Sequence, residues 1–303
     1  MQGAAGARAA AKNGGIDTMR WVVVCAVIAV SGIAWLAINS AQYGAPNFRI
    51  WRMFSGQAHG GKRVCLNGVR IYYETFGSGP PVLVLHGGKA RLEAMHNQIV
   101  ALASDHLVVA PDSRGHGRST DGPGPLHYDD MAADMIGLMD RVHVARADVV
   151  GWSDGGIIGL DMAMRHPDRV SRLVVIGANY DVRGLKDSAD ARASRLDPMA
   201  AVLHGIYHRL QLLTSSDQRV RDERVVRLWR TEPHFALADL ARIRCPVLVI
   251  AGENDVIRPE HTDALARAIP GAREFIVRGA DHMALLRDPR PINAQIRSFL
   301  AGG

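Results

Sequence analysis

The sequence predicts an α/β fold whose sheet contains buried parallel strands. Short apolar, Val-rich segments occur at residues 82–85, 147–150, 173–176 and 247–251, and each runs into a stretch that contains glycine. Continuous apolar runs of this length are typical of strands covered on both faces. The segment at 157–166 has the length and apolar content of a helix packed on a sheet, and it ends near Pro167. About 240 residues follow the N-terminal region, which is enough for one α/β domain.

The turn between the strand at 147–150 and the helix at 157–166 is the most informative segment. Its sequence, Gly151-Trp152-Ser153-Asp154-Gly155, is a G-x-S-x-G motif. A serine on such a strand–turn–helix bend projects its hydroxyl away from the sheet. Glycines on either side avoid collisions where the strand folds back against the helix. The motif therefore predicts that Ser153 is a nucleophile.

A serine hydroxyl needs a base to take its proton and a third group to orient that base. Asp255 follows the apolar strand at 247–251, and His282 follows the last predicted strand. Because parallel strands end at the same edge of a sheet, we expect Ser153, Asp255 and His282 to form a catalytic triad. Glu253 and Asp181 are competing carboxylates, and Asp255 could instead cap the helix that follows it.

The strand at 82–85 runs into His86-Gly87-Gly88. Acyl transfer places negative charge on a carbonyl oxygen, which preorganised backbone N–H groups stabilise. Glycine lets the backbone approach a substrate closely. We predict that the N–H groups of Gly88 and Asp154 form the oxyanion hole, and that His86 holds the loop through its ring nitrogens.

Five segments occur in one order: Leu85–Gly88, Pro111–Ser119, the 151–155 motif, Gly252–Asp255 and Gly279–His282. In this order and spacing they resemble the α/β-hydrolase superfamily over roughly residues 62 to 303. The resemblance implies an eight-stranded, mostly parallel sheet with helices on both faces. Gly151–Gly156 followed by Ile176–Asn179 also resembles the biphenyl-hydrolase-like group, which includes amino-acid ester hydrolases.

The identity of the nucleophile narrows the expected chemistry. Haloalkane dehalogenases and epoxide hydrolases attack carbon through an aspartate at this turn, whereas Ser153 indicates acyl chemistry. We expect a serine hydrolase that cleaves a carboxylic ester or related acyl bond through an acyl-enzyme, with no metal and no organic cofactor. Carbon–carbon bond hydrolysis or perhydrolysis on the same triad is the alternative, and a noncatalytic homologue is a third.

Four residues beside the catalytic positions or a strand end are expected to contact the substrate: Trp152, Asp154, Tyr180 and Met283. The Asp154 carboxylate has two alternative roles. It either holds an ammonium group on the acyl part of a substrate or caps the helix that starts at Gly155.

The alternation of strands and helices stops from about residue 180 to 240, where a mainly helical pattern replaces it. Such an insertion predicts a helical lid over the carboxyl edge of the sheet. An apolar helical face at 199–210 either packs this lid onto the core or lines an acyl pocket. The arginines at 219–230, interleaved with Asp222 and Glu223, indicate a solvated helix face.

The N-terminus has its own organisation. A basic lead at 1–18 precedes the segment at 19–40. Within this segment, residues 21–38 carry no charge and predict an N-terminal apolar helix long enough to cross a hydrocarbon layer of ~30 Å. This segment is either a transmembrane signal anchor or a secretory signal peptide. The basic residues before the run slightly outnumber those after it, which favours a catalytic domain outside the cytoplasm, membrane-anchored or secreted. Residues 41–61 are a predicted linker to the catalytic domain at 62–303.

The overall charge adds little to the choice of partner. The net charge is +6, but charges of both signs are dispersed and no nucleic-acid motif occurs. The expected partners are a small-molecule acyl substrate and a membrane contacted through residues 21–38, and no nucleic acid.

Overall fold

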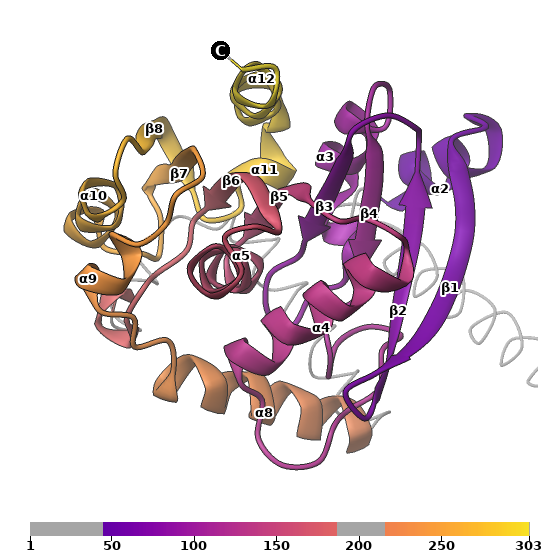
Figure 1. Ribbon diagram of the computed structural model, residues 1–303, viewed down its shortest axis with the longest axis horizontal. Helices are drawn as coiled ribbons and strands as arrows, with labels where there is room; N and C mark the ends of the chain where they lie inside the picture. The colour runs from indigo at the N-terminus through magenta and orange to yellow at the C-terminus, as the bar shows by residue number, and fades with distance from the viewer. Residues whose placement is uncertain (1–44, 187–215, 303) are drawn as a thin grey trace, which may run out of the picture.

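Eight strands form one sheet in the order β1-β2-β4-β3-β5-β6-β7-β8 (Figure 1). The computed structural model describes residues 45–186 and 216–302. β2 is antiparallel to both of its neighbours, and the other pairs are parallel, so the predicted eight-stranded, mostly parallel sheet is confirmed. The strands are β1 (Ala58–Leu66), β2 (Val69–Phe76), β3 (Pro81–Leu85), β4 (Leu107–Pro111), β5 (Ala147–Trp152), β6 (Val170–Ile176), β7 (Val247–Asn254) and β8 (Arg273–Asp281).

Alternate side chains of the central strands enter two separate hydrophobic cores. In β3, Val82 and Val84 pack into one core, while Leu83 and Leu85 pack into the other. None of these four side chains is more than 1% exposed. Successive residues of a strand point to opposite faces of the sheet, so a strand covered on both faces must be apolar throughout. This constraint explains the continuous apolar runs in the sequence.

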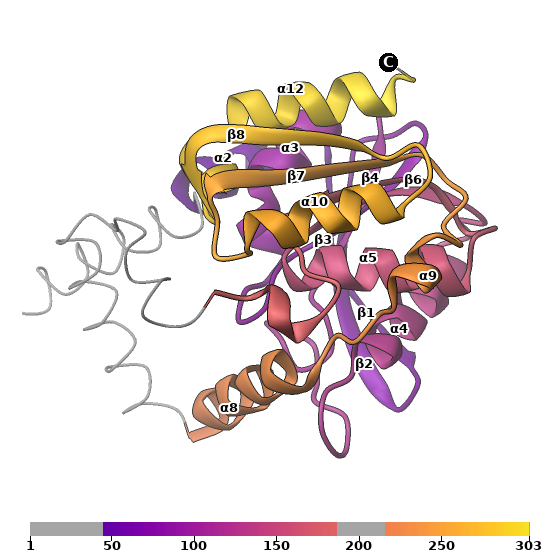
Figure 2. The same ribbon diagram turned by 90° about the vertical axis from the view of Figure 1, so that its left-hand side faces the viewer.

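Helices cover both faces of the sheet and close these two cores (Figures 1 and 2). One core contains side chains from α4 (Tyr128–Arg141), α5 (Asp154–Arg165) and α10 (Pro259–Ala268). The other contains side chains from α2 (Ala45–Phe54), α3 (His96–Leu102), α11 (Ala284–Arg287) and α12 (Pro289–Leu300), together with the 3₁₀ turn η1 (Leu92–Met95).

Helix α2 packs on the sheet, although residues 41–61 were predicted to form a linker. Phe48 is 2% exposed, stacks on Trp51 and contacts Phe76 of β2. Arg52 of the same helix donates a hydrogen bond to Glu74 of β2 at 2.9 Å. Two inward-facing aromatic residues are too few to produce a recognisable helical period, so the sequence pattern gave no sign of this helix. The fold therefore begins before residue 62.

The connection between β6 and β7 contains η2 (Val182–Gly184), α8 (Ser216–Thr231) and α9 (Leu237–Leu240). The lid predicted for about 180–240 lies partly at 187–215, outside the described residues, as does the apolar face at 199–210. Two of the arginines predicted to lie on a solvated helix face instead contact another segment of the chain. Arg221 pairs with Asp121 at 3.1 Å, and Arg224 donates to the Gly122 carbonyl at 3.1 Å. These contacts fasten α8 to the loop after β4.

In the part of the chain that the structure describes, no helix has both the length and the apolar character needed to span a bilayer. The apolar helix predicted at residues 21–38, with the basic lead before it, lies outside that part.

Two phenylalanines of α2 provide a matched test of its packing. We expect Phe48→Ala to lower the free energy of unfolding by about 3–5 kcal/mol, because it empties a site in the core. Phe54 is 78% exposed, so Phe54→Ala should change the unfolding free energy by no more than ~0.5 kcal/mol. Urea unfolding followed by circular dichroism measures both, and equal losses would contradict the packing of α2.

Candidate active site

The bend between β5 and α5 holds Ser153 in a left-handed conformation with φ 53° and ψ −119°. A side chain on either flanking glycine would not fit. A Cβ at Gly151 would lie 2.2 Å from the Gly155 carbonyl oxygen, and a Cβ at Gly155 would lie 2.4 Å from the Leu85 carbonyl oxygen. Positive φ is costly for serine, so the surrounding strand and helix must hold the bend.

The structure brings together the three residues predicted to form a triad. His282 Nε2 lies 3.1 Å from Ser153 Oγ, and His282 Nδ1 lies 2.8 Å from Asp255 Oδ1. Ser153 follows β5, Asp255 follows β7, and His282 follows β8, so three strand ends supply one constellation. An alcohol, an imidazole and a carboxylate in this sequence of contacts can activate the hydroxyl as a nucleophile.

Charge and burial at the site shift the pKa values of both Asp255 and His282. Burial alone would raise the pKa of Asp255, but the neighbouring His282 and the N–H of Ile257, at 3.1 Å, hold that pKa below its usual value. Burial alone would lower the pKa of His282, and the Asp255 carboxylate outweighs it, so the His282 pKa is raised. Asp255 is therefore ionised and fixes the proton on Nδ1, which leaves Nε2 free to accept from Ser153.

The two competing carboxylates have other partners. Asp181 pairs with Arg183 at 2.6 Å and with His234 at 3.2 Å, and Glu253 accepts a hydrogen bond from the Gly279 N–H at 2.7 Å. Asp255 also does not cap α10, whose N-cap residue is Arg258. The geometry thus selects Asp255 as the partner of His282.

A third glycine at the site was not assigned a role from the sequence. Gly177 follows β6 with φ +56°, and a Cβ there would lie 3.0 Å from both Asp255 Oδ2 and His282 Nδ1. Gly177 thus leaves room for the carboxylate and the imidazole to meet beside the end of β6. The sequence feature that could have indicated this role is a glycine directly after an apolar strand.

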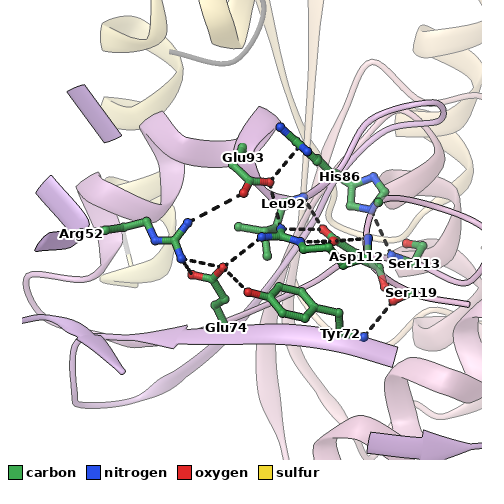
Figure 3. A network of polar contacts seen from close by, with 12 residues as sticks. Arg52, Tyr72, Glu74, His86, Leu92, Glu93, Asp112, Ser113 and Ser119 are labelled. Atoms are coloured by element: carbon green, nitrogen blue, oxygen red, sulfur yellow. Dashed lines mark hydrogen bonds and ion pairs between the residues drawn. The ribbon is translucent and has the colours of Figure 1, made fainter. Parts of the chain in front are cut away.

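The loop that follows β3 is fixed by polar contacts with the end of β4 (Figure 3). The Ser113 N–H donates to His86 Nε2 at 3.0 Å, so Nδ1 carries the proton and donates to the Gly87 carbonyl at 2.7 Å. Burial lowers the pKa of His86, which keeps the ring neutral. His86 thus joins the loop after β3 to the segment after β4 through its two ring nitrogens, which agrees with the structural role predicted from the sequence.

Gly87 and Gly88 lie directly against the bend that carries Ser153. A Cβ on Gly87 would lie 3.1 Å from Ser153 Cβ, and one on Gly88 would lie 2.5 Å from Asp154 Oδ2. The two residues predicted to supply oxyanion donors, Gly88 and Asp154, are therefore neighbours beside the serine. Lys89, the next residue, has φ 56° and continues the strained path of the loop.

Asp154 is the first residue of α5 and is 4% exposed. Its carboxylate accepts hydrogen bonds from the indole N–H of Trp229, with distances of 2.8 and 3.0 Å to the two oxygens. The predicted capping role was wrong, because the side chain points to α8 and not to the amides of its own helix. Burial raises the pKa of Asp154, and His116 and Trp229 offset that rise only in part.

The other predicted substrate residues have contacts within the protein. Trp152 is 5% exposed and donates its indole N–H to the His282 carbonyl at 3.2 Å. Tyr180 stacks on His261, with ring centroids 3.8 Å apart. The Met283 N–H donates to Asp281 Oδ1 at 2.9 Å. Trp152 thus supports the loop that carries His282, and contact of these residues with substrate stays a prediction.

No three His, Cys, Asp or Glu side chains gather into a metal-binding group within residues 45–186 and 216–302.

Comparisons with known proteins extend these observations. Residues 82–295 match the family described as "Alpha/beta hydrolase family". The chain is 33% identical over 229 residues to a candidate carbamate hydrolase, RutD, of Caulobacter sp. (strain K31), covering 68% of this chain and 84% of that protein. It is 28% identical over 254 residues to the human serine hydrolase BPHL, covering 78% and 85%. Among solved structures, Est816, described as an N-acyl homoserine lactone degrading enzyme, aligns with a TM-score of 0.64 at 26% identity, covering 78% and 100%.

The Asp255–His282 contact predicts a measurable pKa change. Asp255→Asn removes the negative charge that stabilises the imidazolium, so we expect the His282 pKa to fall by roughly 1–3 units. An NMR titration of histidine ring signals, with His282 assigned from His282→Gln, measures this pKa. Glu253→Gln, two residues away, is the matched control and should leave it unchanged. An unaltered His282 pKa in Asp255→Asn would contradict the ion pair.

Proposed function

Since this chain belongs to the alpha/beta hydrolase family, we propose that it hydrolyses a carboxylic ester or a related acyl bond through a covalent intermediate on Ser153. The observation that carries the proposal is the continuous path from Ser153 Oγ through the His282 ring to Asp255, with contacts of 3.1 and 2.8 Å. Both distances are within the reach that proton transfer and imidazole orientation require.

The mechanism follows from the order of these contacts. His282 Nε2 takes the Ser153 proton as Oγ attacks the carbonyl carbon, and the carbonyl π electrons move to its oxygen. The N–H groups of Gly88 and Asp154 stabilise that oxyanion. His282 then gives the proton to the leaving group, which departs with the electrons of the broken bond. A water molecule, deprotonated by His282, then attacks the acyl-enzyme carbonyl carbon. As the bond to Oγ breaks, His282 returns this proton to Ser153 and the acid is released.

Asp255 stays ionised throughout the cycle. Its carboxylate holds the Nδ1–H tautomer and stabilises the imidazolium that forms twice in each turnover. The raised pKa of His282 means that the imidazolium form persists to a higher pH, so the activity should decline as the pH falls through that pKa.

The names of the relatives support acyl chemistry in general. A carbamate and an N-acyl homoserine lactone both present a carbonyl carbon bonded to a heteroatom leaving group. An ester has the same arrangement. The alternative is carbon–carbon bond hydrolysis or perhydrolysis, which would use the same three side chains. A noncatalytic role is less well supported, because Ser153, His282 and Asp255 are all present and in contact.

We also propose that residues 21–38 hold the catalytic domain at a membrane, with the domain outside the cytoplasm. The uncharged run itself supports this proposal. Helix α2, which begins seven residues later in the sequence, also supports it, because its side chains Ile50, Met53 and Phe54 are 55%, 70% and 78% exposed. Secretion after removal of a signal peptide is the alternative.

Cell fractionation tests this location. We expect the full chain, with its N-terminus intact, in the membrane pellet after a carbonate wash, because an anchored span resists extraction at high pH. Protease added to intact cells should digest the catalytic domain. A soluble product that begins after residue 38 would contradict the anchor and favour the secreted form.

Active-site labelling tests the chemistry. We expect a fluorophosphonate probe to label the protein at Ser153, and Ser153→Ala to abolish both labelling and ester turnover. Asp255→Asn should lower kcat by roughly 10³–10⁴-fold while the protein stays folded. A panel of aryl esters from short to long acyl chains measures the turnover, with Ser104→Ala as the control. An unlabelled wild-type protein would rule out the proposal, and labelling without turnover of any ester would favour the alternative chemistries.

A further inference from the structure

Trp229, on helix α8 of the connection between β6 and β7, contacts the candidate active site. Its indole N–H donates to both oxygens of Asp154, at 2.8 and 3.0 Å. The ring carbon Cζ2, on the same side of the indole as the N–H, lies against Gly88, where a Cβ would be 2.6 Å away. The ammonium of Lys89 lies 5.2 Å from the centre of the ring. One side chain therefore touches both residues whose N–H groups the proposed mechanism assigns to the oxyanion.

The position of α8 is set by contacts that do not involve the serine. Its C-terminal end is held by Glu232, which binds His127 and accepts from the Tyr128 N–H at 3.0 Å. Its N-terminal half is held by Arg221 and Arg224, which bind the loop after β4. These charge-assisted contacts fix the helix from outside, so Trp229 approaches Asp154 from a rigid support.

The indole N–H satisfies a group that would be costly to leave unpaired. Asp154 is 4% exposed, and a buried carboxylate without a hydrogen-bond donor is strongly unfavourable. The Tyr128 hydroxyl also lies beside this carboxylate, so without the indole N–H the carboxylate would turn toward Tyr128 and displace the residue to which it belongs. The Asp154 N–H would then lose its direction toward the substrate oxygen.

The same ring also supports the other side of the oxyanion hole. Gly88 precedes Lys89, whose positive φ of 56° is a conformation that most side chains avoid. Within the loop, the Ala90 N–H donates to the Gly87 carbonyl at 3.2 Å, and the cation–π contact of Lys89 with Trp229 adds a contact from outside the loop. Trp229 thus contacts the loop at the residue where the backbone is strained.

We propose that Trp229 is a positioning residue that holds Gly88 and Asp154 at the correct separation, so that the placement of α8 determines whether the oxyanion hole is complete. The inference rests on the proposed hydrolase function and adds to it a residue with no place in the triad. Because oxyanion donors act mainly on the transition state, the loss should appear in kcat and leave KM nearly unchanged.

The test uses the full chain and two replacements of different size. Trp229→Phe removes the donor and shortens the ring. Substitution of Trp229 by β-(3-benzothienyl)alanine keeps the ring size and removes only the N–H. We expect both to lower kcat for an aryl acetate by roughly 10–100-fold, part of the loss expected when an oxyanion donor is removed. Trp51→Phe, on α2 and in the opposite core, is the matched control and should retain wild-type kcat.

A double variant separates positioning from general destabilisation. Asp154→Asn removes the charge that the indole N–H stabilises, so Trp229→Phe should lower kcat much less in the Asp154→Asn background than in the wild type. A structural defect would instead add fully to the Asp154→Asn effect. A smaller cost in the double variant supports the proposal, and full additivity overturns it.

Other outcomes also decide the matter. A Trp229 variant with kcat within twofold of wild type would overturn the proposal, and so would a raised KM with unchanged kcat, which would make Trp229 a substrate contact. If Trp229→Phe does not fold, the benzothienyl variant provides the same comparison. Fluorophosphonate labelling of the wild type distinguishes the hydrolase function from the positioning role of Trp229. A wild type that is not labelled would disprove the hydrolase function itself. A labelled wild type with fully active Trp229 variants would disprove only the positioning role.

Discussion

The bend at Ser153 is the constraint on which the candidate site depends. The strand that precedes it is buried on both faces, and the helix that follows turns back so closely that neither Gly151 nor Gly155 has space for a Cβ. The Ser153 N–H donates to the Ile176 carbonyl of β6 at 2.8 Å, which fixes the bend to the neighbouring strand. The strained φ of Ser153 is thus held by rigid elements, and the hydroxyl has one direction in which to project.

Other residues of the site hold His282 and Asp255 in place beside the Ser153 hydroxyl. His282 comes from the end of β8, and Trp152, directly before the serine, donates to the carbonyl of His282 at 3.2 Å. The histidine is thereby tied to the nucleophile turn through its backbone as well as through its ring. Gly177, which follows β6, leaves the space in which Asp255 and His282 meet. Ser153, Asp255 and His282 are far apart in sequence, but they lie within hydrogen-bonding distance because the strands that carry them end at the same edge of the sheet.

The convergence of Ser153, Asp255 and His282 could be predicted because each follows a strand, and the ends of parallel strands share one edge. The central strands could be predicted because buried strands are apolar throughout. The full set of eight strands came from the resemblance to a known superfamily, since β1 and β8 are mostly exposed and carry no continuous apolar run. The role of Asp154 could not be predicted, since its partner Trp229 is distant in sequence and lies on a helix with only two fully buried apolar side chains, Val225 and Leu228. Helix α2 was missed for a similar reason, because its place depends on a tertiary contact with β2.

Buried charges explain how helix α2 and the loop after β3 are held in one arrangement (Figure 3). Glu74 and Asp112 are fully buried carboxylates, and Arg118 pairs with both, at 3.3 and 2.9 Å. Arg52 of α2 neutralises Glu74 from the other side, while Asp112 accepts the N–H of Leu92, where η1 begins. An apolar core of the same volume would tolerate small shifts of these segments, whereas buried carboxylates require their donors at fixed distances. The network therefore restricts the loop that carries Gly87 and Gly88 to one position relative to the sheet.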